Sequence, residues 1–270
     1  MLKKIVFILM LFGKSQLQAQ ELFPFTEPAS NMPSRSLSAK FAAYGGVEND
    51  RLQQRYVPEL MWGVNKKWML HAATSFSNMH ETKMQWESAF FYAKYRFFSN
   101  DAVHQHFRMA AFATGGYSKN AIHDDELNVQ GENSGFQTGV IATQLINKVA
   151  FSGSASFLKT IKNSEKNAVV NEEGAALNVT LSSGYLLLPK EYVNFNQLNV
   201  NLYTEILGQK RLDNKTYYVD VAPAIQFIFK SNSKLNIGYR FPLAVTENRS
   251  LRQSFLLSFE HTFFNVFKKK

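Results

Sequence analysis

Apolar and polar residues alternate with a period of two through most of this chain. Between Tyr217 and Phe229 the odd positions carry Tyr, Val, Pro, Ile and Phe, whereas the even ones include Asp220 and Gln226. This pattern predicts an extended strand with one apolar and one polar face. Similar segments recur from Leu37 onward, and the helical period is nearly absent. About twelve strands are predicted, around 37–43, 60–62, 68–76, 89–97, 107–113, 135–145, 149–157, 177–187, 198–206, 217–229, 235–241 and 255–267.

The connections between these segments also alternate, between long and short. The long polar stretches are 45–54, 78–83, 119–133, 160–173, 209–215 and 242–253. The short connections are 65–67, 99–103, 147–148 and 231–234, and 189–196 is the longest exception. Long loops on one rim and tight turns on the other are typical of an outer-membrane barrel, in which both termini share the short-turn side. The sequence therefore predicts an all-β fold, an antiparallel up-and-down transmembrane β-barrel of about 12 strands.

A soluble β-sandwich or a lipocalin-like barrel would also show alternation, and is the rival interpretation. In such a protein, however, the apolar face would have to fit into a small core, and this chain holds 24 Phe. The polar face carries small residues such as Ser152, Ser154 and Ser156, which suit a crowded or watery interior. Since hydrocarbon offers no partner to a backbone amide, a chain can cross it without helices only as a closed sheet. The membrane barrel is the favoured interpretation.

The first twenty residues have the three-part layout of a secretory signal. Lys3 and Lys4 precede an apolar run from Ile5 to Phe12, and Ala19 stands at a plausible cleavage position. The run is too short to cross a bilayer as a helix, which needs roughly 20 apolar residues. We expect residues 1–20 to be a cleaved signal peptide, and the protein to reach the outer membrane of a diderm bacterium.

The remaining chain divides into three parts. Residues 21–36, rich in Pro and small residues, are expected to be an N-terminal periplasmic lead-in that reaches into the lumen or along the short-turn rim, or else serves as a passive strap. Residues 37–267 are expected to form the outer-membrane β-barrel, with residues 268–270 as a basic tail. Removal of the signal lowers the formal net charge from +9 to +6, of which the tail supplies three charges, so no broad basic face is left for nucleic acid.

The polar face of the strands places ionisable side chains inside the predicted barrel. A charge facing lipid near the middle of the bilayer would cost about 2 to 4 kcal/mol, so these groups are expected to point inward. The predicted lumen-lining residues are Lys40, Glu59, His71, Lys94, Arg96, His106, Arg108, Glu205, Asp220, Arg240 and Glu260.

Two interpretations of these charges stay open. Mixed charges that line a pore would orient a small polar solute, which makes the protein a passive channel or binding barrel. A network of salt bridges and hydrogen bonds could equally plug a narrow barrel, giving a closed structural or surface-interaction barrel without a pore. Lys94, Arg96, Arg108 and Arg240 could favour anions, but Glu59, Glu205, Asp220 and Glu260 could neutralise them.

Enzymatic chemistry finds little support, and no enzymatic activity, cofactor or metal is predicted. The absence of Cys excludes cysteine nucleophiles and thiolate zinc sites. A membrane-embedded lipid hydrolase that uses Ser and His on the outer wall remains a second alternative, although no constrained nucleophile motif is present. The histidines are His71, His80, His104, His106, His123 and His261. The loop from His123 to Glu126 is a weak candidate for a metal site and is better interpreted as a solvated acidic loop.

Several local strings resemble an uncharacterised family of Bacteroidetes-type outer-membrane β-barrel proteins, described as porins or transporters. These strings are TEPASNMP at 26–33, AKYRFF at 93–98, ATQL at 142–145, LPKEY at 188–192 and FFNVF at 263–267. The alternating aromatics that end at Phe267 also resemble the terminal strand that the barrel-assembly machinery binds, although three lysines follow here. The resemblance implies the fold, the location and two kinds of partner, outer-membrane lipids and the barrel-assembly machinery. It implies no substrate or catalytic residue.

Overall fold

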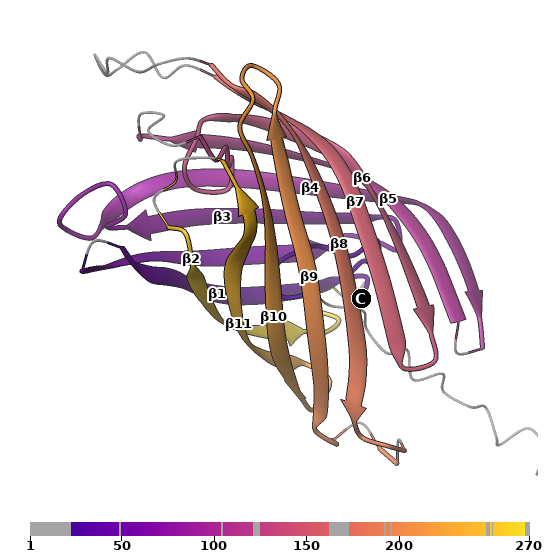
Figure 1. The fold of residues 1–270 in the computed structure, drawn as a ribbon. Helices are drawn as coiled ribbons and strands as arrows, with labels where there is room; N and C mark the ends of the chain where they lie inside the picture. The colour runs from indigo at the N-terminus through magenta and orange to yellow at the C-terminus, as the bar shows by residue number, and fades with distance from the viewer. Residues whose placement is uncertain are drawn as a thin grey trace, which may run out of the picture.

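The computed structural model describes residues 23–48, 50–103, 105–120, 125–161, 173–191, 193–194, 196–246, 249 and 251–267. These residues form twelve strands that close into one barrel (Figure 1). The strands are β1 (Ser36–Glu48), β2 (Arg51–Gly63), β3 (Trp68–Ser77), β4 (Gln85–Ala102), β5 (Gln105–Ser118), β6 (Gly135–Ile146), β7 (Val149–Thr160), β8 (Ala175–Leu188), β9 (Asn199–Arg211), β10 (Tyr217–Phe229), β11 (Ser233–Val245) and β12 (Ser254–Phe263). The predicted signal peptide and the basic tail lie outside the described residues.

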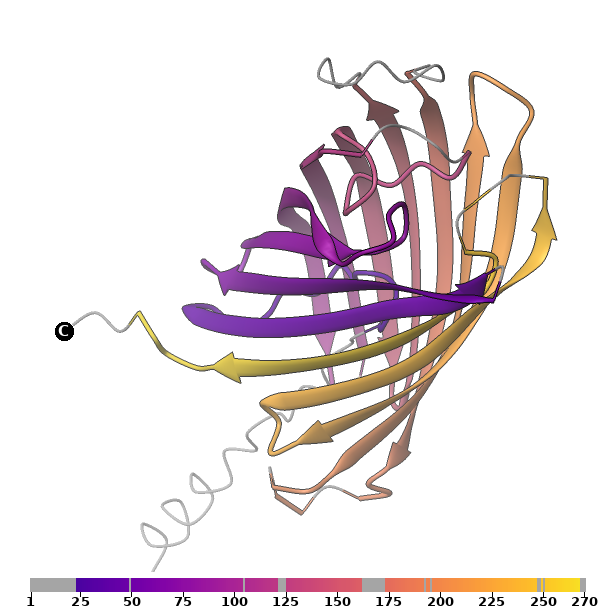
Figure 2. The ribbon, with the colours of Figure 1, turned by 90° about the vertical axis from the view of Figure 1, so that its left-hand side faces the viewer.

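Each strand pairs antiparallel with its neighbours in sequence, and the barrel closes where β1 meets β12. Leu37 is paired with Phe263 and Gly45 with Phe255, so this seam is continuous over most of β1. In Figure 2 the yellow last strand lies beside the indigo first strand at that closure. Closure leaves no sheet edge with unpaired amides. The predicted fold, an antiparallel up-and-down barrel of about 12 strands, is confirmed.

Several predicted loops are shorter than expected, among them those after β1 and β11. The connection after β1 was expected to span 45–54, but β1 and β2 stay paired from Ser36–Gly63 as far as Glu48–Arg51. The polar residues Gln53 and Gln54 look like loop residues, yet they continue the ladder. Similarly, β11 runs past Pro242, which pairs with Asp220 beside a register shift in β10. A strand interior tolerates proline best at such an irregularity, where a ladder hydrogen bond is already missing.

The outer surface of the barrel is apolar and its interior is polar. On β8 the side chains of Leu177, Val179 and Leu181 are exposed, whereas Ser182 is buried. A soluble barrel would place its large apolar side chains inside. The rival water-soluble architecture is therefore wrong for this chain, because the aliphatic and aromatic face points outward.

Aromatic side chains gather near both ends of the strands. Trp68 and Tyr95 lie with ring centroids 4.8 Å apart at the short-turn rim, and Trp86 and Tyr117 lie 6.2 Å apart at the long-loop rim. Rings at these two levels match the aromatic girdles that outer-membrane barrels place at headgroup depth. Among the described residues, no helix has the length and apolar character needed to cross a membrane.

Candidate functional site

The segment that precedes β1, residues 23–35, lies inside the barrel, and we call it the strap. Phe23 packs against Leu145, Ala150 and Tyr203 on the lumen wall. The ring of Phe25 lies over Gly238, where any Cβ would meet it within 2.6 Å. The lead-in predicted for residues 21–36 thus enters the lumen from the short-turn rim, and residues 21 and 22 lie outside the described part.

Lys94 on β4 is the main anchor of the strap. Its ammonium group donates to the carbonyl oxygens of Pro28 at 2.7 Å and Ser30 at 2.9 Å, and lies 3.1 Å from the Glu27 carboxylate. The side chain is fully buried, with 0% of its surface exposed. Burying an ammonium group is unfavourable unless it is paired and hydrogen-bonded, and the strap supplies those partners.

Three other wall residues hold the strap along its length. The Glu205 carboxylate accepts hydrogen bonds from the Phe25 amide at 2.8 Å and from the Thr26 hydroxyl at 2.6 Å. Thr143 accepts from the amide of Ala29 at 2.8 Å, and Arg108 donates to the Ser30 hydroxyl at 3.0 Å. The strap is therefore bound on three sides of the lumen, by β4–β5, by β6 and by β9.

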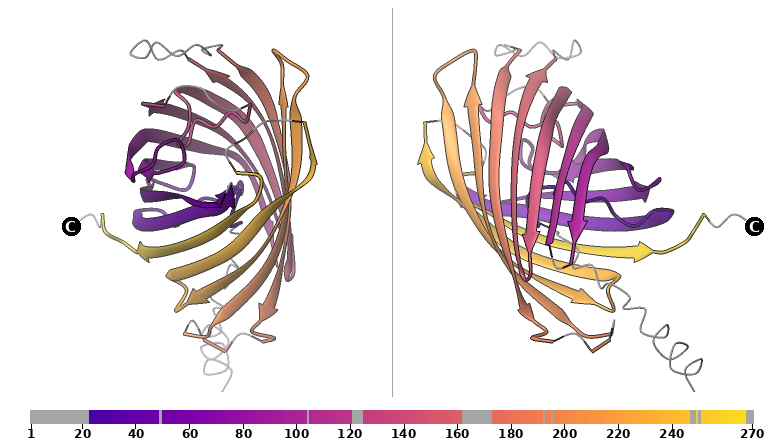
Figure 3. Two further views of the ribbon diagram at one scale, coloured as in Figure 1. Left: turned by 60° about the vertical axis from the view of Figure 1, so that its left-hand side comes forward. Right: turned by 90° about the vertical axis from the view of Figure 1, so that its right-hand side faces the viewer.

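At the long-loop rim, residues 125–134 of the connection between β5 and β6 fold into the barrel (Figure 3). Leu127 and Val129 are buried against Leu158 and Ala176. Gln209 forms two hydrogen bonds of 2.8 Å with the main chain of Leu127, one to the amide and one to the carbonyl. This inward segment, residues 125–134, narrows the lumen from the side opposite the strap.

Ion pairs hold the inward segment in place. Glu126 lies 2.9 Å from Arg240 and 3.5 Å from Arg249, and both arginines also contact Asp220. On the other side of the segment, Glu132 accepts from Arg55 at 3.0 Å.

A third contact involves the loop that follows β9. Arg211 lies 3.7 Å from Asp125 of the inward segment and donates to Asp213 at 2.9 Å. Hydrogen bonding to Arg211 holds the pKa of Asp213, a loop residue, below its usual value, despite the opposing effect of burial. The inward segment is thus tied to β2, β9, β11 and the connection after β11.

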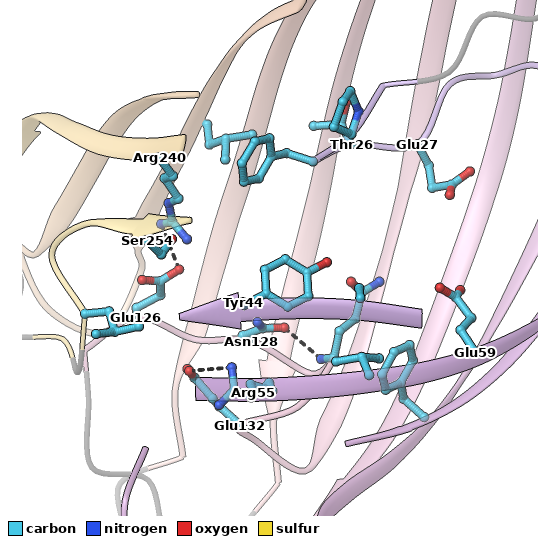
Figure 4. A pocket seen from close by; sticks show the side chains of 18 of the residues that line it. Thr26, Glu27, Tyr44, Arg55, Glu59, Glu126, Asn128, Glu132, Arg240 and Ser254 are labelled. Carbon is cyan, nitrogen blue, oxygen red and sulfur yellow. Dashed lines mark hydrogen bonds and ion pairs between the residues drawn. The ribbon is translucent and has the colours of Figure 1, made fainter. Parts of the chain in front are cut away.

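Between the inward segment and the strap lies a cavity of about 240 Å³, which we call the chamber. In Figure 4, Glu27 and Glu59 lie at one side of the chamber and the pair of Arg240 and Glu126 at the other, with Tyr44 between them. A second cavity, of about 50 Å³, lies toward the short-turn rim. Phe23, Pro24 and Glu27 line both cavities, so the strap is the partition between the two.

The chamber is lined by equal numbers of acidic and basic side chains. Of its described lining residues, the cations are Lys40, Arg55, Arg240 and Arg249, and the anions are Glu27, Glu59, Glu126 and Glu132. Lys40 lies 3.3 Å from Glu59, which also contacts His71 at 2.6 Å. Each of the four cations has an acidic partner within 4 Å. The formal charges of the lining therefore cancel.

The predicted lumen-lining residues occupy different parts of the interior. Lys40, Glu59, His71 and Arg240 line the chamber. Lys94, Arg108 and Glu205 hold the strap, and Glu260 lies beside the smaller cavity, 2.8 Å from Lys234. His106 lies 3.0 Å from Asp101, and Asp220 pairs with the two arginines. Arg96 is half-buried on β4 and lines neither cavity.

The four cations that could have favoured anions do not form one group. Lys94 and Arg108 lie near one another, as expected, because both reach Ser30. They are engaged with the strap, however, whereas Arg240 lies at the far end of the chamber with Asp220 and Glu126.

The sequence pattern did not identify four of the charged residues that line the chamber. One lies in β2 near its start, and three lie in loops. Arg55 shares the inward parity of Val57 and Glu59, but it stood next to a stretch assigned to a loop. Glu126, Glu132 and Arg249 belong to connections, where no alternation marks an inward side chain. The parity of β2 could have revealed Arg55, and nothing in the sequence pattern indicates the other three.

The structure also places the residues of the two other site hypotheses, the lipid hydrolase and the metal-binding loop. Ser233 and His261 form a hydrogen bond of 2.7 Å on the outer wall near the short-turn rim, but no acid or amide bonds to the other ring nitrogen of His261 within the described chain. In the acidic loop, His123 and Asp124 lie outside the described residues, while Asp125 and Glu126 pair with arginines. No cluster of three or more His, Cys, Asp or Glu able to hold a metal occurs among the residues described.

This chain is similar to known proteins in structure, but no similarity in sequence was found. No protein family model matches this chain, and no curated protein does. An outer membrane channel from Pseudomonas putida F1 matches with a TM-score of 0.55 and 14% identity, over 90% of this chain and 100% of that one. The NanC porin matches with a TM-score of 0.51 and 10% identity, over 83% of this chain and 98% of that one. At these identities the likeness concerns the fold alone: this chain has the fold of outer-membrane channel barrels, and its resemblance to a Bacteroidetes-type family stays a prediction.

Proposed function

We propose that this protein is a passive channel or binding barrel for small polar solutes in the outer membrane of a diderm bacterium. The observation that carries the proposal is the chamber, a cavity of about 240 Å³ lined by charged and aromatic side chains inside a barrel with an apolar outer surface. A polar interior within an apolar wall provides a route for solutes that hydrocarbon excludes.

In this proposal residues 1–20 are removed as a signal peptide, and the long loops face the outside of the cell. Outer-membrane lipids cover the apolar wall, and the barrel-assembly machinery engages β12. No cofactor takes part. The strap constricts the route, because it separates the chamber from the short-turn side and is bound to three parts of the wall.

The same strap supports the competing proposal, a closed structural or surface-interaction barrel. Its contacts with Lys94, Thr143 and Glu205 would hold a permanent plug as well as a constriction. The two proposals differ in whether ions cross the lumen of the intact protein.

Planar-bilayer recording on the purified, folded protein separates them. A channel with a constricted lumen gives reproducible conductance steps smaller than those of an open twelve-stranded barrel. Folded protein that inserts into the bilayer, as judged by protease protection of the barrel, but gives no steps would defeat the channel proposal. A heat-denatured sample is the control for leakage caused by detergent.

A further inference from the structure

Two buried polar atoms of side chains that line the chamber have no hydrogen-bond partner within the described part of the chain. They are Nε2 of His71 and the hydroxyl of Tyr92. Each side chain is only 3% exposed, and both residues line the chamber. A buried polar group without a partner costs about 1–3 kcal/mol, so a wall that keeps two such atoms side by side calls for an explanation.

The two atoms belong to one rigid piece of the wall. His71 on β3 and Tyr92 on β4 are directly paired across the strands, and their ring centroids lie 4.7 Å apart. Phe112 stacks on Tyr92 at 5.7 Å, and Nδ1 of His71 lies 2.6 Å from Glu59. Both rings are therefore held in place by neighbours that leave the two polar atoms free.

The chemistry of the two atoms suits hydroxyl groups. A carboxylate can only accept, so Nδ1 of His71 donates to Glu59, and a neutral His71 then presents Nε2 as an acceptor. The Tyr92 hydroxyl can both donate and accept. A molecule with neighbouring hydroxyl groups can donate to one of these atoms and donate to or accept from the other.

The rest of the chamber favours a small molecule without net charge. Its acids and bases cancel, and Lys40 and Glu59 already neutralise each other beside His71. A charged solute would have to replace one of these partners at the cost of an unpaired buried charge. Phe25, Tyr44 and Phe90 add apolar faces to the lining, and the volume of about 240 Å³ lies below the ~300–1,000 Å³ of usual ligand pockets.

We propose that His71 and Tyr92 form a subsite of the chamber that binds a small, uncharged, polyhydroxylated solute, such as a single sugar ring. The inference rests on the proposed function and deepens it by naming the class of solute. Nε2 of His71 accepts from one hydroxyl of the solute, the Tyr92 hydroxyl bonds to a second, and the aromatic side chains contact the C–H faces of the ring.

Equilibrium binding to the full-length folded protein tests this subsite. Ligand-observed NMR would compare glucose with glucuronate and glucosamine, which keep the ring but carry a negative or a positive charge. We expect glucose to bind more tightly than either. Tyr92→Phe removes only the unpartnered hydroxyl and should weaken glucose binding about two- to tenfold, the effect of one hydrogen bond.

Tyr203→Phe is the matched control. The Tyr203 hydroxyl already donates to Gln226 at 3.2 Å, and Tyr203 lines neither cavity, so this variant should bind glucose as the wild type does. Folding of each variant is checked by heat-modifiable migration on a gel. If Tyr92→Phe fails to fold, His71→Gln, which keeps a donor toward Glu59, takes its place and should weaken binding to the same extent.

Each remaining outcome overturns the inference. These outcomes are that glucose does not bind, that a charged ring binds more tightly than glucose, or that Tyr92→Phe and Tyr203→Phe lose binding to the same extent. Conductance, measured on the same wild-type sample, distinguishes failure of the subsite from failure of the channel proposal. Conductance without glucose binding removes the subsite and leaves the channel, whereas glucose binding without conductance removes the channel and leaves a binding barrel.

Discussion

Lys94 reaches from the wall of the barrel to the main chain of Ser30, with 2.9 Å between its ammonium nitrogen and the carbonyl oxygen. The two residues are 64 positions apart in sequence, and Ser30 belongs to a segment without regular strand pairing. One fully buried cation thus joins the strap to the strand framework.

Replacing Lys94 should widen the lumen. Lys94→Met keeps the length of the side chain but leaves Glu27 and two strap carbonyls without their donor. Breaking a buried ion pair costs about 3–5 kcal/mol, and release of the strap from the wall avoids much of that cost. We expect larger single-channel conductance steps than in the wild type.

The matched control for that prediction is Lys234→Met. Lys234 is also buried and pairs with Glu260 at 2.8 Å, but its described contacts are with the wall and not with the strap. Its replacement should destabilise the barrel without enlarging the conductance. Equal conductance changes in the two variants would mean that the strap does not set the width of the lumen.

Because the outer wall is apolar, the effect of a charged substitution on stability should depend strongly on its position. Leu181 lies mid-strand on β8 and is 58% exposed, so Leu181→Lys would place an ammonium group among lipid tails. We expect the free energy of unfolding, measured by urea titration in lipid vesicles, to fall by about 2–4 kcal/mol. Leu212→Lys, in the loop after β9, should change it by less than about 0.5 kcal/mol. Comparable losses at both positions would contradict a lipid-facing wall at β8.

The balanced charges of the chamber predict weak ion selectivity. In a gradient of potassium chloride, the wild-type reversal potential should lie close to zero. Glu126→Gln leaves the lining with one excess positive charge beside Arg240 and Arg249, so the reversal potential should shift toward anion preference. Glu191→Gln, which removes an exposed carboxylate outside the chamber, should not shift it. A strongly selective wild-type protein would contradict the cancellation of charge in the lining.

The sequence predicted the barrel well because alternation is set by the environment of each strand. A strand such as β8, with Leu181 toward lipid and Ser182 toward the lumen, has to alternate wherever it crosses the bilayer, so the pattern repeats in every strand. Chain closure then follows, since an open edge in hydrocarbon would leave amides without partners.

The interior was harder to predict because parity places a side chain inside the barrel without giving its partner. Glu205 was expected in the lumen, but its partners Phe25 and Thr26 lie 180 and 179 residues away, in a segment that carries no pattern. The inward segment was equally hard to predict. Leu127 is buried because it contacts β7, β8 and β9, and the sequence around it carries no pattern that indicates this burial.

The lipid hydrolase alternative predicts phospholipid turnover that depends on Ser233 and His261. Their hydrogen bond lacks the third group that orients the base in known nucleophilic sites. We therefore expect no release of fatty acid from phospholipid vesicles by the wild type, and no difference in Ser233→Ala. Turnover that disappears in Ser233→Ala and in His261→Ala would show that the protein is a hydrolase.

The strap narrows the lumen between the chamber and the short-turn rim, and a reversible lock tests this constriction most directly. The chain contains no Cys, and the hydroxyls of Thr26 and Ser182 lie 3.0 Å apart. Thr26→Cys and Ser182→Cys, combined with Lys94→Met, therefore allow a single disulfide to tie a released strap back to the wall. We predict wild-type conductance for the oxidised protein and the larger Lys94→Met conductance after reduction, within one recording. The same conductance before and after reduction, in a sample whose disulfide has been verified by mass spectrometry, would contradict the account.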